Sequence, residues 1–431
     1  MKFVSTRKQA PIASLSEALR NGAAPDGGLY MPDVIPAAPA GLDPDAPLPE
    51  FAAALLRPYF EGDALADALP TICAEAFDFK VPLVAPDPEQ PGLNALELFH
   101  GPTGAFKDVG ARFLMGCFDR LASGSPLNVL VATSGDTGGA VGCAAENRTS
   151  VRATILFPHG RVSPFQERQL TCWGENVQAL DVDGDFDDCQ HLVKAAFSDA
   201  DLASEHRLTS ANSINFGRLL PQLAYTARSV QQVYAKVGVE PGVIVPSGNL
   251  GQGFCVLLAK AMGLPVGPVV LATNANRTLK DWRDTGKYAA RPSLETLANA
   301  MDVGNPSNFE RVAALGTDPA DVHVELVTDD QIRARIHADF KRTGYVWCPH
   351  SATAAEAYAR LSLEQQSERP WIVAATAHPY KFADIVEPLI GAKIEPTPAL
   401  AAIYERSTRK TEISADLASL EGVLRGRMAV A

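Results

Sequence analysis

Residues 128–139 read NVLVATSGDTGG, and this stretch decides the fold class. Its first half is a short run of apolar and β-branched residues, which is typical of a buried strand. Its second half consists of small residues and leads into a helical pattern at about residues 138–146. A strand that turns directly into a helix is the unit from which parallel sheets flanked by helices are built. The stretch therefore predicts an α/β protein.

The same unit recurs along the rest of the chain. Further strands are predicted at residues 151–157, 177–182, 243–245, 269–273 and 371–375. Two parallel sheets would leave a cleft at the carboxyl ends of their strands, where ligands usually bind. We therefore expect two parallel-sheet α/β domains with a ligand cleft between them, plus an N-terminal domain. The approximate bounds are 1–92 for the N-terminal domain, 93–225 for the first α/β domain and 226–431 for the second. These bounds leave open that the chain crosses from one domain to another.

Composition excludes several classes of protein. The 431 residues carry a net charge of -12, which argues against the basic face that nucleic acids require. The seven cysteines are scattered without paired spacing, so neither a metal site nor a disulfide framework is indicated. We find no apolar run long enough for a signal peptide or a membrane span. We expect a cytoplasmic protein, monomeric or homodimeric, with a small-molecule substrate and no nucleic-acid or membrane partner.

The first candidate site is residues 100–108, HGPTGAFKD, where Lys107 lies among small and apolar residues. Burial lowers the pKa of an amine, and a neutral amine can attack an aldehyde to form a Schiff base. The alternative is a surface lysine whose stem packs on the protein while its charge reaches water. Composition alone favours that alternative.

Two small-residue turns between a strand and a helix are candidate anion sites. Residues 134–139, SGDTGG, and residues 247–253, SGNLGQG, each precede a helix whose first backbone amides lack partners. Such amides can bind a carboxylate or a phosphate. The alternatives are a plain turn capped by Asp136 or Thr137 in the first case, and a plain glycine-rich turn in the second.

Two further polar clusters remain. Residues 212–218, NSINFGR, offer amide, hydroxyl and guanidinium groups that suit a phosphate, or else a helix cap with Arg218 paired to an acidic neighbour. Residues 376–382, TAHPYKF, place Thr376 at a strand end, where it could face a ring nitrogen or simply cap the next turn. We expect the histidine there to be structural and Lys381 to be solvated. Together the clusters suit an aldehyde cofactor that carries a phosphate, and a substrate that carries a carboxylate and another phosphate.

Six motifs occur in the order seen in one family: HGPTGAFKD, TSGDTGGA, NSINFGR, PSGNLGQGF, AMDVGNPSNFER and TAHPYKF. They resemble the threonine synthases, pyridoxal-phosphate enzymes of the tryptophan-synthase-β fold type. The opening of the chain, with GAAPDGGLYMP at residues 22–32, also resembles the N-terminal domain of the longer threonine synthases. The resemblance implies a pyridoxal 5'-phosphate-dependent lyase that converts O-phospho-L-homoserine and water into L-threonine and phosphate.

The resemblance also implies roles for residues at matching positions. Lys107 would carry the Schiff base and move protons, and Asp136 would lie near the phenolic oxygen of the cofactor. Thr376 would bond the pyridine nitrogen. The cofactor phosphate would be held by Ser247, Gly248, Asn249, Leu250 and Gly251. The substrate would be bound by Thr103, Ser134, Gly135, Thr137, Asn212, Ser213 and Arg218.

This sequence departs from the family pattern at Gly104, at residues 276–282 and at Ser351, which leaves the fine fit of the substrate open. The nearest rival function is a phospholyase of the same fold, which releases a keto acid, ammonia and phosphate. A non-catalytic metabolite sensor would be expected to lack Lys107 or the phosphate turn. A nucleotide-dependent oxidoreductase would need an acidic residue that binds ribose after a strand.

Overall fold

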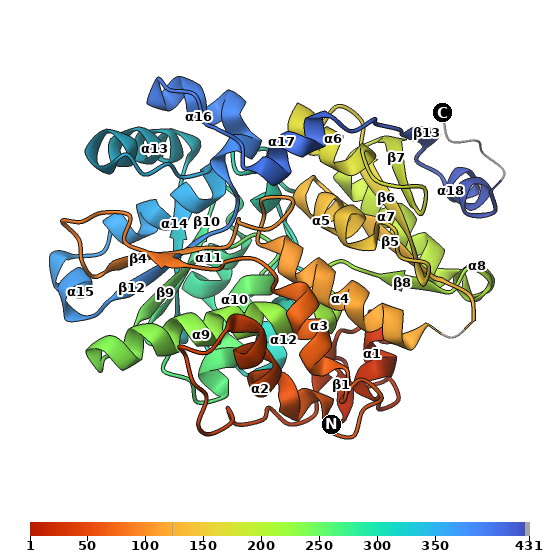
Figure 1. Cartoon of the computed structure of the whole chain (residues 1–431), viewed down its shortest axis with the longest axis horizontal. Helices are drawn as coiled ribbons and strands as arrows, with labels where there is room; N and C mark the ends of the chain where they lie inside the picture. The colour runs from red at the N-terminus through yellow and green to blue at the C-terminus, as the bar shows by residue number, and fades with distance from the viewer. Residues whose placement is uncertain (123, 427–431) are drawn as a thin grey trace.

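The N-terminal segment packs against the body of the protein instead of standing apart from it (Figure 1). The structure is a computed structural model that describes residues 1–122 and 124–426. Phe3 and Leu56 are buried in the same apolar core as Phe113 and Leu223. The segment contains β1 (Phe3–Ser5), α1 (Leu15–Asn21), β2 (Tyr30–Pro32), α2 (Leu48–Phe60) and α3 (Leu69–Ala76), with β1 and β2 paired antiparallel.

A five-stranded parallel sheet has the order β13-β7-β6-β5-β8. Leu130 faces one side, covered by α7, α8 and α18, while Val129 and Val131 face the side of α4, α5 and α6. The strands are β5 (Leu127–Ala132), β6 (Val151–Pro158), β7 (Val177–Asp183), β8 (Leu208–Ser210) and β13 (Thr411–Ser414). The helices are α4 (Lys107–Leu121), α5 (Asp136–Ala145), α6 (Pro164–Thr171), α7 (Phe186–Ser198), α8 (Ala200–Glu205) and α18 (Leu417–Leu424).

A six-stranded sheet has the order β11-β10-β9-β12-β4-β3, and only β3 runs antiparallel to its neighbour. Ile244 packs toward α13, α14 and α16, while Val243 and Val245 pack toward α9 and α10. The strands are β3 (Leu83–Val84), β4 (Leu93–Glu97), β9 (Gly242–Pro246), β10 (Val269–Thr273), β11 (Val322–Leu326) and β12 (Trp371–Ala375). The helices are α9 (Leu220–Val237), α10 (Gly251–Ala261), α13 (Asp329–Thr343), α14 (Pro349–Ala359) and α16 (Ala383–Ile390).

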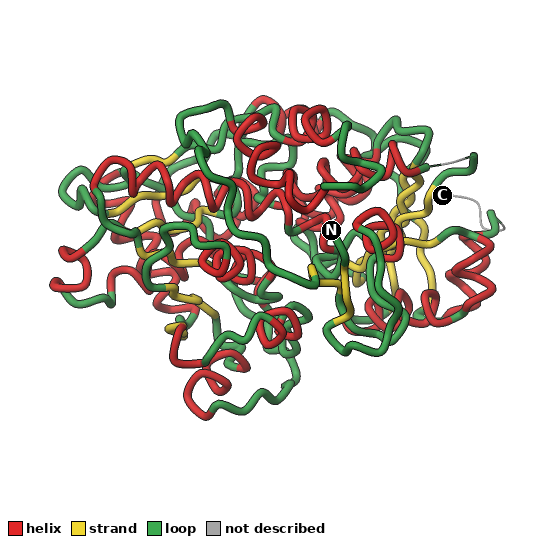
Figure 2. Tube along the Cα trace, turned by 90° about the horizontal axis from the view of Figure 1, so that it is seen from below, coloured by secondary structure: helices red, strands yellow, loops and turns green. Residues whose placement is uncertain are grey.

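Shorter elements connect these layers. They are η1 (Phe216–Arg218), α11 (Thr278–Thr285), η2 (Asn299–Met301), α12 (Phe309–Ala314), η3 (Pro319–Asp321), α15 (Leu363–Glu368), η4 (Pro379–Phe382) and α17 (Pro398–Tyr404). Figure 2 shows the strands gathered into two groups, with helices and loops around and between them. Within the described residues, no helix has both the length and the apolar character needed to cross a membrane.

The predicted α/β class with two largely parallel sheets is confirmed, and each predicted strand is present. The chain also crosses between the sheets. β4 follows residue 92 but pairs with β12 in the six-stranded sheet, and β13 lies near the C-terminus but pairs with β7 in the five-stranded sheet. The simple bounds at 92 and 225 therefore misplace these two strands, because strand pairing joins segments far apart in sequence. The division into three domains stays a proposal.

Candidate active site

Lys107 is fixed where the two sheets meet. It is the first residue of α4, and the preceding loop is tied to the end of β12: the N–H of Phe106 donates to the carbonyl of Thr376 over 2.8 Å, and Ala105 forms a bridge with Ala377. Burial lowers the pKa of Lys107 to about 8. Asp136 opposes this shift by favouring the charged amine, whereas the positive charges of Arg218 and Lys381 reinforce it. Lys107 is therefore a partly buried amine and not a freely solvated surface lysine.

The turn before α5 caps its helix terminus only in part. Gly135 has φ 137° and ψ −92°, a conformation that only glycine adopts readily, and a Cβ there would lie 2.5 Å from Nε2 of Gln166. The hydroxyl of Thr133 accepts from the N–H groups of Gly135 and Gly138, both over 3.0 Å. The alternative in which Asp136 or Thr137 caps α5 is thus wrong. The half-buried Ser134 and Thr137 stand beside this open end.

Asp136 is buried and paired with a lysine from a distant part of the chain. Its Oδ1 lies 3.2 Å from Nζ of Lys381 and accepts from Nε2 of Gln166 over 3.1 Å. Burial raises the pKa of Asp136, but Lys381, Lys107, His350 and the Gln166 hydrogen bond together hold it below its usual range. The expectation that Lys381 is solvated is wrong, since its side chain has no exposed surface. In this site it acts as the counter-ion of Asp136.

The turn between β9 and α10 has the strained and crowded backbone of a binding loop. Leu250 adopts the left-handed conformation, with φ 61° and ψ 9°, which is uncommon for a residue other than glycine. Gly248 packs so closely on η2 that a Cβ would lie 2.6 Å from Cα of Met301. No described side chain caps α10. Strain of this kind concentrates at functional sites, and the open amides at Gly251 suit an anion.

Asn308, which motif reasoning did not assign, joins the two predicted phosphate clusters. Its Nδ2 donates to Oγ of Ser213 over 2.9 Å and to the carbonyl of Asn249 over 3.0 Å. Oδ1 of Asn249 accepts in turn from the N–H of Ser307 over 2.7 Å and from its hydroxyl over 2.8 Å. Arg311 is fully buried nearby and donates to the carbonyl of Ser213 over 2.9 Å. Ser307, Asn308 and Arg311 all belong to the motif NPSNFER at residues 305–311. The motif was recognised in the sequence, but nothing in it indicated that these residues contact Ser213 and Asn249.

The structure places Asn212 and Arg218 on backbone carbonyls. Nδ2 of Asn212 donates to the carbonyl of Ala132 over 2.9 Å. Arg218 is 3% exposed and donates to the carbonyls of Ala211 and Lys107, and its Nε has no protein partner. Burial lowers the pKa of Arg218 to about 10. The alternative in which Arg218 pairs with an acidic side chain is not seen among the described residues.

Thr376 lies at the end of β12, as predicted, and is almost fully buried. Its N–H donates to the hydroxyl of Ser351 over 2.9 Å, so the departure at position 351 keeps a hydroxyl with a defined role. Thr376 does not cap the next turn; the ring of His378 accepts there from the N–H of Tyr380. His378 is thus structural, as expected. His350 also lines this region, and burial lowers its pKa to about 4.

Thr103 and Gly104 fix the conformation of the loop that precedes Lys107. The hydroxyl of Thr103 donates to Oδ1 of Asp108 over 2.5 Å, and its side chain has no exposed surface. The side chain therefore holds the loop, which differs from the substrate contact that the resemblance implies. Gly104 has φ 67°, and a Cβ there would lie 3.1 Å from Cδ1 of Leu400. Leu400 fills the space beside Gly104.

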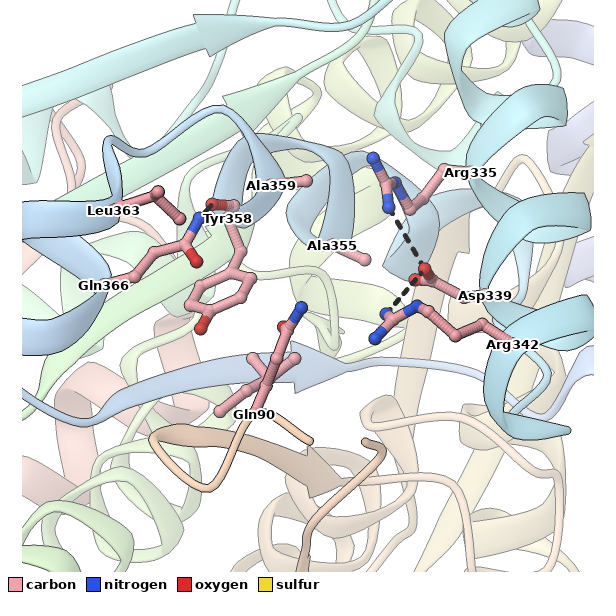
Figure 3. Close-up of a pocket in the computed structure, with 10 residues that line it drawn as sticks. Gln90, Arg335, Asp339, Arg342, Ala355, Tyr358, Ala359, Leu363 and Gln366 are labelled. Carbon is pink, nitrogen blue, oxygen red and sulfur yellow. Dashed lines mark hydrogen bonds and ion pairs between the residues drawn. The ribbon is translucent and has the colours of Figure 1, made fainter. Parts of the chain in front are cut away.

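A separate cavity of about 220 Å³ lies between α13 and α14 (Figure 3). Arg335 and Arg342 point into it, and both pair with Asp339, at 3.1 and 3.2 Å. Arg335 also pairs with Glu356, and Arg342 with Asp87. Because carboxylates within the protein match both positive charges, the cavity has little attraction for an anion. No cluster of metal-binding side chains is found among residues 1–122 and 124–426.

The chain is similar to known proteins over nearly its whole length. The family model for pyridoxal-phosphate-dependent enzymes matches residues 85–376, and those for the N terminus and the C-terminal part of threonine synthase match residues 2–77 and 351–424. The threonine synthase of Haemophilus influenzae is 35% identical, over 98% of this chain and 99% of that protein. The crystal structure of threonine synthase from Escherichia coli superposes with a TM-score of 0.90 at 33% identity, covering 99% of this chain and 100% of that one.

The structure of pyridoxal-phosphate-bound threonine synthase from Brucella melitensis gives a TM-score of 0.89 at 35% identity, over 99% of both chains. A serine racemase from maize, at 17% identity and a TM-score of 0.56, shares the fold alone. The matches to the threonine synthases extend over the N-terminal segment, both sheets and β13. The chain therefore belongs to the threonine synthase family of pyridoxal-phosphate-dependent enzymes.

Proposed function

We propose that this protein converts O-phospho-L-homoserine and water into L-threonine and phosphate, with Lys107 as the catalytic residue. The observation that carries the proposal is a partly buried amine whose charge acts on Asp136 at the start of α5, together with the uncapped N-terminus of α10, in a chain of this family. An amine with a pKa of about 8 has a substantial neutral fraction near neutral pH, as carbonyl chemistry requires.

The residues present fit pyridoxal 5'-phosphate. A phosphate suits the turn from Ser247 to Gly251, because close packing at Gly248 and the left-handed Leu250 hold the amides of α10 open. The hydroxyl of Thr376 would face the pyridine nitrogen, and Asp136 would lie near the phenolic oxygen. When bound, the cofactor supplies an electron sink that stabilises negative charge at the substrate α-carbon.

The substrate would bind between the N-terminus of α5 and the polar cluster at residues 212–218. Ser134, Gly135 and Thr137 would hold its carboxylate at the N-terminus of α5, where the helix dipole favours negative charge. Asn212, Ser213 and Arg218 would bind its phosphate, with the unpartnered Nε of Arg218 adding positive charge nearby. Thr103 would contribute through its loop, since its hydroxyl is already donated to Asp108.

Lys107 would perform the proton transfers. In its neutral form Nζ can accept the proton that leaves the substrate α-carbon and return one later. Nζ would next accept a β-proton as phosphate leaves from the γ-carbon. The γ-carbon would then take up a proton to become the methyl group, water would add its hydroxyl at the β-carbon, and return of a proton to the α-carbon would give threonine. Burial of the surrounding groups keeps bulk water from competing for these protons.

Product analysis tests this function against the phospholyase alternative, which the comparisons do not favour. Purified protein supplied with pyridoxal phosphate and O-phospho-L-homoserine should release threonine and phosphate in equal amounts. Borohydride reduction followed by peptide mapping should place a pyridoxyl group on Lys107. Release of a keto acid and ammonia in place of threonine would overturn the proposal.

Capture of the cofactor by cofactor-free protein should depend on pH through Lys107. Because the neutral amine reacts, the rate should rise about tenfold per pH unit below pH 8 and level off above it. The measurement is the absorbance change on mixing with pyridoxal phosphate at a series of pH values, with a free lysine derivative as the reference amine. A profile that follows the reference, which titrates near its usual pKa of about 10.4, would contradict the account.

We further propose that the enzyme works in the cytoplasm. All seven cysteines are free thiols, and such thiols persist in a reducing compartment.

A further inference from the structure

Lys381 is a buried cation with a complete set of partners. It lies in η4, directly after β12. Its Nζ donates to the carbonyl of Thr103 over 2.7 Å and to Oε1 of Gln169, and it lies 3.2 Å from Oδ1 of Asp136. An ammonium group has three N–H donors, so these three acceptors satisfy it in full. The proposed reaction assigns Lys381 no role.

The partners of Lys381 come from three separate elements. Thr103 belongs to the loop that leads to Lys107, Asp136 begins α5, and Gln169 lies in α6. Nε2 of Gln169 also donates to the carbonyl of Thr103 over 3.0 Å, which closes a small network. Lys381 therefore joins the loop of the reactive amine to α5 and α6, two helices that pack on the five-stranded sheet.

Asp136 stands between two lysines but pairs with only one of them. Its Oδ1 is taken by Lys381 and Gln166, while its Oδ2 has no hydrogen-bond partner among the described residues. Lys107 is close enough for its charge to act on Asp136, yet it forms no ion pair with any described carboxylate. A buried carboxylate without Lys381 would draw the Lys107 ammonium toward itself, since unpaired buried charges are costly.

We propose that Lys381 is a positioning residue that acts as the ion-pair partner of Asp136. Because Asp136 is already paired, it does not stabilise the charged form of Lys107, and Oδ2 of Asp136 stays available to a ligand. This inference rests on the proposed function, because it assumes that Lys107 must react as a neutral amine. Other charged or titratable groups face the pair: Asp108 from α4, Arg218 from η1, His350 from α14 and Cys348 at the start of α14.

The test measures Lys107 directly in cofactor-free protein, without reference to turnover. Amines are labelled with a trace of acetic anhydride across a pH series, and mass spectrometry follows the peptide that contains Lys107. In Lys381→Met the labelling midpoint of Lys107 should rise by about one pH unit, which makes labelling about tenfold slower below the midpoint. Lys381→Arg retains the charge and should restore most of the reactivity.

A double-mutant cycle separates this role from general support of the fold. In the Asp136→Asn background, at least half of the shift caused by Lys381→Met should disappear, because the carboxylate that traps Lys107 is gone. Lys393→Met is the control, since Lys393 is exposed and forms a surface ion pair with Glu387. An unchanged midpoint in Lys381→Met, or an equal shift in both backgrounds, would overturn the proposal.

Asp136→Asn alone keeps the proposal testable if Lys381→Met does not fold. If Lys381 already occupies Asp136, this substitution should lower the Lys107 midpoint by less than about one pH unit. A larger fall would mean that Asp136 already holds Lys107, contrary to the proposal. None of these results depends on product formation, whereas failure of the proposed function would show as the absence of a pyridoxyl group on Lys107.

Discussion

Replacing Lys107 by alanine should reduce the rate of threonine formation by roughly a thousandfold or more, while the protein stays folded. Positioned proton transfer alone contributes about 10²–10⁴-fold to an enzymatic rate, and Lys107 would also supply the amine that binds the cofactor. The fold should tolerate the change because the Lys107 amine is partly buried and forms no ion pair among the described residues. Steady-state assay of threonine and phosphate release measures the loss, and thermal denaturation reports the stability.

The matched control is Lys393→Ala, which removes an exposed lysine from a surface ion pair with Glu387. Surface pairs contribute little, so activity and melting temperature should both stay close to those of the unmodified protein. Residual activity of Lys107→Ala above about one-tenth of the original rate would mean that another group performs the proton transfers.

The sequence was sufficient to predict features that depend on neighbouring residues. NVLVATSGDTGG and VIVPSGNLGQG each contain a strand, a turn and a helix start, so their local structure follows from pattern alone, and both strands are present as β5 and β9. Lys107 could be named as a candidate because small and apolar residues adjoin it in the chain, but composition alone favoured a surface lysine, and the resemblance to the family supplied its expected role.

Features that depend on distant pairing could not be predicted. β4 and β13 are short, and only their pairing with β12 and β7 shows to which sheet they belong. Lys381 was expected to be solvated, since lysines usually are, and its partner Asp136 lies 245 residues earlier in the chain. Asn308 likewise connects Ser213 with Asn249, two residues that adjoin only in the folded protein.

Replacing Gly248 by alanine should weaken the binding of pyridoxal phosphate by about 10- to 100-fold, which corresponds to about 1–3 kcal/mol of overpacking. The new Cβ would lie 2.6 Å from Cα of Met301 and 3.2 Å from the carbonyl oxygen of Ala300. Both are backbone atoms of η2, so no side chain can rotate away to relieve the contact. The turn itself must move, and with it the amides at the start of α10.

A fluorescence titration of cofactor-free protein with pyridoxal phosphate measures this loss, and Gly92→Ala is the control. A Cβ at Gly92 would meet nothing nearer than the carbonyl oxygen of Gln366 at 3.6 Å, an ordinary contact far from the site. Because Leu250 is already held in the left-handed conformation, the turn has little freedom to absorb a further displacement. Equal cofactor affinity in both variants would show that the phosphate is held elsewhere than in the turn from Ser247 to Gly251.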